Sequence, residues 1–323
     1  MTTLGTTHTA GKGESSTAFG YGCGTMMAVG ASVSFVAARG GVLEGLAPDD
    51  MIAARSLVAG LVLLPFLLRW GLPSLAGIGW PRGLALLVTG GPLFAILQTG
   101  GYAFAPLAHG AVIAPSVVTI LSTIGAGLLL SERVTQSHLV GASLVIAGIV
   151  VIGWQSVMRG TSGETAWIGD LLFVLSSMLW TGFTLLIRHW RLDAVRATVV
   201  VGVLSLAVSL PLYVSYRGWA HVSALPPGAL VFQGILQGLV QGVITFMAYG
   251  RAVAILGVSR AVLFPALVQA ISILIGIPFL GEIPGPAQIA GLLLVSIGMF
   301  AAVGRWNRRP TAANTLAMSE KSS

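Results

Sequence analysis

Long apolar runs that contain almost no charged residues constrain this chain more than any other feature. Ten stretches of about 20 mostly apolar residues, each long enough to cross a bilayer as a helix, follow one another between residues 19 and 304. Only 8% of the 323 residues are charged, whereas a soluble domain carries roughly 25%. So few charges cannot cover a water-facing surface of this size. The sequence therefore predicts an all-α membrane protein whose surface is covered mainly by lipid.

The ten predicted transmembrane helices are separated by charged or turn-forming residues. In chain order they are residues 19–38, 51–68, 84–104, 110–130, 137–154, 167–187, 198–216, 229–250, 258–280 and 287–304. With the N-terminus in the cytoplasm, 13 of the 17 Lys and Arg residues fall on the cytoplasmic side, three lie outside and Arg55 lies within a span. Because cytoplasmic loops carry an excess of basic residues, this bias predicts a multi-pass inner (plasma) membrane protein with both termini in the cytoplasm.

An internal repeat divides the membrane region into two halves. Five residues recur after 150 positions: Pro115, Glu132, Gly141, Leu144 and Gly148 correspond to Pro265, Glu282, Gly291, Leu294 and Gly298. The predicted organisation is a disordered cytoplasmic N-terminus (1–18), a first repeat of five helices (19–155), a second repeat of five helices (156–304) and a cytoplasmic tail (305–323). Because five is odd, the second repeat enters the membrane with reversed polarity. Inverted repeats of this kind build a substrate site near the midplane that opens alternately to each side.

The segments that carry the repeat resemble a known family. AHGAVIAPSVVTILSTIGAGLLLSERVTQSHLVGASLVIAGIVVI, GVSRAVLFPALVQAISILIGIPFLGEIPGPAQIAGLLLVSIGMFAAV and GDLLFVLSSMLWTGFTLLIRHW are similar to the EamA-type, ten-helix members of the drug/metabolite transporter (DMT) superfamily. The resemblance implies export or exchange of metabolites, often amino acids or related compounds. It also implies a central cavity lined by the first, third, fourth, sixth, eighth and ninth helices. The chain departs from the pattern at Ser56, where many relatives carry Phe, and it has no carboxylate in the first span.

Polar and aromatic residues inside the spans are the candidate substrate-binding residues, because a polar group in the membrane is costly unless it faces a cavity or a partner. The candidates are Gln98, Tyr102, Trp180, Gln237, Gln241 and Gln269. In the eighth span, glutamines at positions 233, 237 and 241 recur at intervals of four and share one helix face. Two interpretations of these amides stay open: contact with a solute, or hydrogen bonds that hold helices together. Trp180 lies in the middle of its span, where it either stacks on a solute or fills the core.

Five further residues are candidates for gating or for a structural role: Arg55, Pro115, Glu132, Pro265 and Glu282. Arg55 lies inside the second span, where it snorkels to the interface, pairs with Asp49 or Asp50, or attracts an anionic group. The two prolines loosen their helices. The two glutamates lie in turns just before a helix, where the helix dipole favours a carboxylate.

Other functional classes find little support in the sequence. The five histidines are dispersed and Cys23 is the only cysteine, so we predict no metal site and no cofactor. The chain has no phosphate-binding glycine loop, and its basic residues are too scattered for nucleic acid. The predicted partners are a small-molecule solute and the lipid bilayer, and the oligomeric state is not specified. The sequence predicts a gradient-driven transporter rather than an enzyme. The alternatives are a non-transporting membrane scaffold or sensor and a membrane-embedded transferase.

Overall fold

Nearly all the residues that this computed structural model describes, 10–130, 136–158, 165–256 and 263–303, are helical, and none of them forms a strand. The helices are α1 (Ala10–Leu43), α2 (Pro48–Trp70), α3 (Trp80–Gly90), α4 (Pro92–Phe104), α5 (Leu107–Leu130), α6 (Gln136–Met158), α7 (Ala166–His189), α8 (Ala194–Ala224), α9 (Pro227–Gln233), the π-helix η1 (Gly234–Thr245), α10 (Phe246–Leu256), α12 (Leu263–Leu280) and α13 (Pro286–Val303). The predicted all-α class is confirmed.

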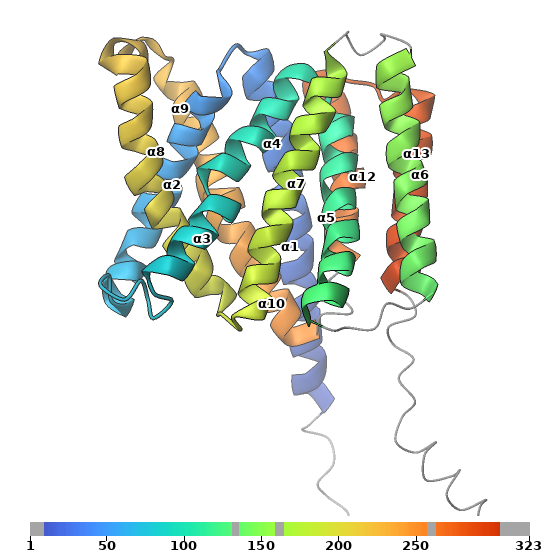
Figure 1. Cartoon of the computed structure of the whole chain (residues 1–323), viewed down its shortest axis with the longest axis horizontal. Coiled ribbons are helices and arrows are strands. Elements are labelled where there is room, and N and C mark those ends of the chain that lie inside the picture. The colour runs from blue at the N-terminus through green and yellow to red at the C-terminus, as the bar shows by residue number, and fades with distance from the viewer. Residues whose placement is uncertain (1–9, 131–135, 159–164, 257–262, 304–323) are drawn as a thin grey trace, which may run out of the picture.

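The described elements form ten rods that stand side by side (Figure 1). Two rods are composite: α3 and α4 form the third, and α9, η1 and α10 form the eighth. Among the described residues, six helical segments are long and apolar enough to cross a membrane, and four shorter apolar helices accompany them. α1 begins and α13 ends at the same end of the bundle, which we call the terminal end; the other is the opposite end (Figure 1).

The contact between α6 and α13 shows the symmetry of the two repeats. A Cβ added at Gly148 would lie 2.8 Å from the Gly291 carbonyl oxygen, and one added at Gly298 would lie 2.7 Å from that of Gly141. A shift of 150 residues exchanges Gly141 with Gly291 and Gly148 with Gly298, so it converts each of these contacts into the other. Small residues let helices approach closely in lipid, where no hydrophobic force drives them together. The inverted repeat that the sequence predicts is therefore present in the packing.

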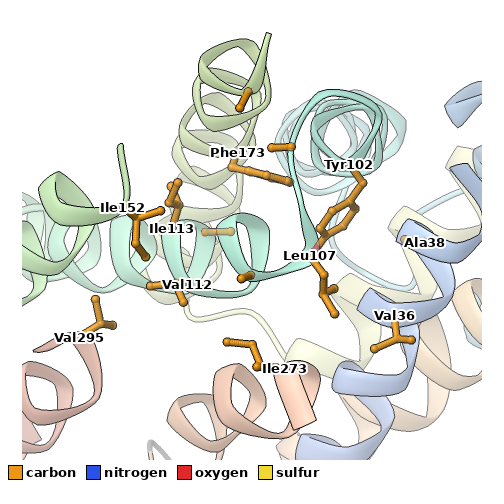
Figure 2. Packing of buried hydrophobic residues seen from close by; sticks show 14 of the residues in the cluster. Val36, Ala38, Tyr102, Leu107, Val112, Ile113, Ile152, Phe173, Ile273 and Val295 are labelled. Carbon is orange, nitrogen blue, oxygen red and sulfur yellow. The ribbon is translucent and has the colours of Figure 1, made fainter. Parts of the chain in front are cut away.

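Apolar side chains fill the part of the bundle around α5. Tyr102 and Phe173 pack edge to face with ring centroids 5.0 Å apart, and Leu107, Val112 and Ile113 extend this cluster toward α12 and α13 (Figure 2). A second apolar cluster joins α2, α3, α7 and α8. Large apolar side chains also cover the outside, as Leu274 and Phe279 do at 67% and 77% exposure. A surface of this kind belongs in a bilayer, which makes this a multi-pass membrane protein.

Candidate functional site

A cavity of about 50 Å³ lies between α2, the junction of α3 and α4, α7, α8 and the η1–α10 segment. This is room for several water molecules, since one needs about 10–15 Å³. Residues from both repeats line it. The polar ones are Arg55, Ser56, Thr198 and Ser205, and the aromatic ones are Trp180, Phe183 and Phe246. The resemblance predicted a cavity lined by the first, third, fourth, sixth, eighth and ninth helices. This one is lined by the second, third, sixth, seventh and eighth.

Arg55 is the charged residue of the cavity wall, and no residue that the structure describes forms a hydrogen bond or an ion pair with its side chain. The carboxylates that the sequence offered as its partners are engaged elsewhere. Asp49 accepts two hydrogen bonds from Arg217, at 2.5 and 2.6 Å. Asp50 accepts one from the Tyr213 hydroxyl at 2.6 Å and lies 3.0 Å from His221 Nε2. Of the three interpretations of Arg55, pairing with Asp49 or Asp50 is not seen in this structure.

Close helix packing fixes the backbone of Arg55. A Cβ added at Gly238 would lie 2.7 Å from the Arg55 carbonyl oxygen, so only a glycine lets η1 approach α2 this closely. Gly234 is also close to α2, since a Cβ there would lie 2.8 Å from Val58 Cγ2, whereas Gly242 makes only an ordinary contact with Ala59. The glycine stripe of the eighth rod therefore packs against α2 and holds Arg55 beside the cavity. π-Helical turns such as those of η1 occur often at functional sites.

The third rod is broken at the cavity wall. α3 ends at Gly90 and α4 begins at Pro92, and the Gly91 between them leaves the helical conformation. A Cβ at Gly91 would overlap the Leu87 carbonyl oxygen, so a glycine is needed here. The first turn of a helix carries unpaired N–H groups and a partial positive charge. The cavity therefore faces the positive end of α4 in addition to Arg55.

Aromatic rings form one side of the cavity. The Trp180 ring lies 4.9 Å from that of Phe94, 5.0 Å from that of Phe183 and 5.2 Å from that of Phe246, centroid to centroid. These rings come from α4, α7 and α10, and Trp180 is half-buried at their centre. Of the six predicted substrate-binding residues, Trp180 is the one that lines this cavity.

Gln233, the last residue of α9, and Gln237 of η1 face α1 instead of the cavity. Gln237 Nε2 donates to the Ser34 carbonyl oxygen at 2.6 Å, and Gln233 Nε2 donates to that of Ala37 at 2.7 Å. For these two glutamines, the structure therefore shows the second interpretation given above, hydrogen bonds that hold helices together. Gln241 also lies outside the cavity wall, and its buried Oε1 has no hydrogen-bond partner.

The other predicted polar residues lie deeper in the packing. Gln98 Oε1 accepts from Ser176 at 2.7 Å, while its Nε2 is buried without a partner. Tyr102 is fully buried in the cluster around α5, and its hydroxyl is also unpartnered. Gln269 Nε2 lies 3.3 Å from Met299 Sδ. None of the three reaches the cavity, so their role in binding stays a prediction.

An ion pair between Arg39 and Glu282 lies at the opposite end of the bundle, and we call it the clasp. Arg39 Nε lies 2.6 Å from Glu282 Oε1, and Arg39 Nη1 donates to the Tyr102 carbonyl oxygen at 2.5 Å. Glu282 Oε2 accepts from the Leu107 backbone N–H at 2.8 Å. The carboxylate thus binds the first turn of α5, and not that of α13, whose start the sequence had suggested.

The remaining candidates for gating are less informative. Pro115 lies within a continuous α5, and its carbonyl oxygen accepts from Thr119 at 2.8 Å. Pro265 is in the first turn of α12, where the missing N–H of proline is tolerated. Glu132 lies outside the described residues. In the part of the chain that the structure describes, no three His, Cys, Asp or Glu side chains gather as metal ligands.

Sequence reasoning overlooked Arg39 and Ser205. Arg39 directly follows the first predicted span, and Arg188, 149 positions later, directly follows the sixth, so their matching places in the two repeats were a usable signal. Ser205 gives no signal, because a single serine in an apolar helix is common.

Comparisons with known proteins agree with this architecture. A curated relative described as a probable terminal-alkyne amino-acid exporter, from Streptantibioticus cattleyicolor, is 26% identical over 230 residues, which are 70% of this chain and 74% of the relative. A solved structure described only as the crystal structure of a protein has a TM-score of 0.60 at 20% identity, and the match covers 91% of this chain and 99% of that one. That likeness shows the fold. The model of the EamA-like transporter family matches twice, at residues 18–154 and 167–304, and so the chain belongs to the EamA-like transporter family.

Proposed function

We propose that this transporter exports amino acids or related small metabolites across the plasma membrane, by alternating access around the cavity between its two repeats. One observation carries the proposal. An unpaired Arg55 faces a cavity lined by residues of both repeats. An intramembrane charge is expensive and marks a substrate pathway in most membrane proteins that keep one. The description of the Streptantibioticus relative as an amino-acid exporter supports the choice of cargo.

Buried polar atoms without partners support a role for the predicted residues elsewhere in the transport cycle. Gln98 Nε2, Tyr102 Oη, Gln241 Oε1 and Gln269 Oε1 are all buried and unpartnered. Each such atom costs about 1–3 kcal/mol. A rearranged bundle that brings water or solute to these atoms would recover this cost. We therefore keep these four residues, with Gln237, as candidate contacts of a wider substrate path.

The same observations weigh against the alternative functions. A scaffold or sensor predicts polar groups that pair between helices and leave no cavity, which is not the case for Arg55. A membrane-embedded transferase needs a cluster of ionisable groups, and the described cavity wall offers Arg55 alone. We propose a transporter without enzymatic activity whose two termini are cytoplasmic, as the distribution of Lys and Arg indicates.

Counterflow in proteoliposomes tests the proposal. Vesicles loaded with unlabelled amino acids should accumulate the labelled ones faster than protein-free vesicles. Ala95→Phe places a ring in the cavity wall and should abolish counterflow. Ala103→Phe, on the exposed face of the same helix, should leave it intact. Size-exclusion profiles of both variants check that they fold. Wild-type flux equal to that of protein-free vesicles, for every proteinogenic amino acid, would overturn the proposed function.

A further inference from the structure

We propose that the cavity recognises a carboxylate, bound by Arg55 and the first turn of α4, on a solute whose apolar body lies against Trp180. The inference rests on the proposed function and deepens it, because it names the chemical group that a cargo must carry. It separates amino acids and other small carboxylic acids from amines of the same shape. It also assigns a role to Arg55.

Arg55 offers the cavity a guanidinium that no described residue binds. Pro48 begins α2, so Arg55 lies about 10 Å along the helix axis, within the second rod. Both nearby aspartates are held by α8, through Arg217 in one case and through Tyr213 and His221 in the other. Arginine presents a planar fork of donors that matches a carboxylate in a bidentate pair.

Two serines of the cavity wall, Ser56 and Ser205, offer further hydrogen-bonding groups to a carboxylate. Serines inside helices usually bond the carbonyl four residues earlier, as Ser34 and Ser116 do in this chain, at 2.9 and 2.5 Å. Ser56 and Ser205 line the cavity, and no described residue forms a hydrogen bond with either hydroxyl. Both residues are less than 9% exposed. Their hydroxyls are therefore available to a ligand or water in the cavity, whose wall also holds Arg55.

The cavity wall carries a positive charge, which favours an anionic group of the solute. Gly91 and Pro92 bring the positive end of α4 to the same cavity, and no described carboxylate lines it. Broken transmembrane helices commonly point their N-termini at anionic groups of a substrate. The carbonyl end of α3, at Gly90, lies at the same wall and offsets part of the positive end of α4, so Arg55 is the dominant charge there, and a carboxylate would neutralise it.

The aromatic side of the cavity indicates that the rest of the solute is apolar. Trp180, Phe183 and Phe246 offer ring faces within the same wall. An apolar or aromatic side chain gains burial and stacking against them. The Thr198 hydroxyl donates to the Ala194 carbonyl at 2.8 Å, which leaves its lone pairs to accept from an ammonium group. An α-amino acid with a bulky apolar side chain carries chemical groups that match these, and the cavity of about 50 Å³ must widen to hold it.

The experiment compares three solutes that share one body: L-phenylalanine, 3-phenylpropionate without the ammonium, and phenethylamine without the carboxylate. Each competes with labelled L-phenylalanine in counterflow by wild-type proteoliposomes. We expect 3-phenylpropionate to compete and phenethylamine to be weaker by about tenfold or more, the factor for one charge-assisted hydrogen bond. Arg55→Gln should raise KM for L-phenylalanine by about tenfold or more, and Arg55→Lys should raise it less. Ser56→Ala combined with Ser205→Ala should raise it further.

The control variants are Arg82→Gln, which removes a guanidinium that stacks on Trp190, and Ser143→Ala, which removes a hydroxyl bonded to the Leu139 carbonyl. Both should leave KM unchanged. Equal competition by the amine, or an unchanged KM in a folded Arg55→Gln protein, would overturn the carboxylate inference while leaving the proposed function intact. An absence of flux for every amino acid would instead overturn the proposed function, and the inference with it.

Discussion

Arg39 and Glu282 join the two repeats of this transporter through a bond of 2.6 Å between Arg39 Nε and Glu282 Oε1. Arg39 belongs to α1 in the first repeat, and Glu282 lies in the turn between α12 and α13 in the second. Their side chains are 15% and 23% exposed, so the pair is only weakly screened by solvent. An alternating-access carrier must separate such contacts whenever this end of the bundle opens.

The first prediction concerns the stability of the clasp. Glu282→Gln leaves the Arg39 charge without its partner and weakens the bond to the Leu107 N–H, which should lower the free energy of unfolding by about 1–3 kcal/mol. The charge exchange Arg39→Glu with Glu282→Arg should recover part of this loss. Thermal unfolding in detergent measures both effects. An apparent Tm of Glu282→Gln equal to that of the wild type would show that the clasp contributes no stability.

The second prediction concerns movement of the clasp. Arg39→Cys and Glu282→Cys, introduced together in a Cys23→Ser background, place a pair of thiols at the opposite end. A short bifunctional thiol reagent should link them and stop counterflow, because this end could no longer open. Each single cysteine variant is the control and should keep its flux after the same treatment. Undiminished flux in the linked protein would rule out opening at Arg39 and Glu282.

The third prediction concerns the glycine contact between α6 and α13. Gly148→Ala pushes a methyl group against the Gly291 carbonyl and should destabilise the protein by about 1–3 kcal/mol. Gly250→Ala is the matched control, because a Cβ there meets nothing within 4 Å. It should be neutral or stabilising, since alanine favours a helix over glycine by about 1 kcal/mol. Equal Tm values for the two variants would mean that the helices separate at no cost.

The sequence predicted the ten helices well, because length and hydrophobicity decide whether a segment spans a bilayer. It was less accurate at the ends, and Arg39 shows why. Arg39 was taken as the break after the first helix, yet α1 continues to Leu43. Its charge is paired with Glu282, and a paired charge does not have to leave the helix. This partner lies 243 residues away, so local patterns cannot reveal it. The break expected at Arg217 is present, because Gly218 has a φ of 77° and leaves the helical conformation within α8.

The cavity was predictable only in part. Arg55 and Trp180 stood out because a charge inside a membrane span and a Trp in the middle of one are unusual, and both line the cavity. The glutamine stripe of η1 also stood out, but periodicity identifies a helix face without saying what that face contacts. The sequence did not predict the break at Gly91, because glycines in a membrane span also occur where helices pack closely.

The fourth prediction concerns Trp180 and the size of the solute. Trp180→Ala removes the ring that Phe94, Phe183 and Phe246 surround. Loss of stacking worth about 1–2 kcal/mol should raise KM for L-phenylalanine roughly tenfold. KM for L-alanine, which is too small to use the ring, should change much less. Trp180→Phe should retain most of the affinity for both, and counterflow measures each constant. A parallel loss for the two amino acids would show that Trp180 supports the fold instead of the solute.

The last prediction separates the two interpretations of the η1 glutamines. Gln233→Leu and Gln237→Leu each remove a hydrogen bond to a carbonyl of α1. Interhelical bonds of this kind contribute about 0.6–2 kcal/mol, so both variants should lose stability in thermal unfolding. Gln241→Leu removes an amide whose buried oxygen has no partner, and it should keep or gain stability. If Gln241 contacts solute during the cycle, its variant alone should raise KM in counterflow. A raised KM in Gln237→Leu, with an unchanged Tm, would instead show that Gln237 leaves Ser34 to bind the cargo.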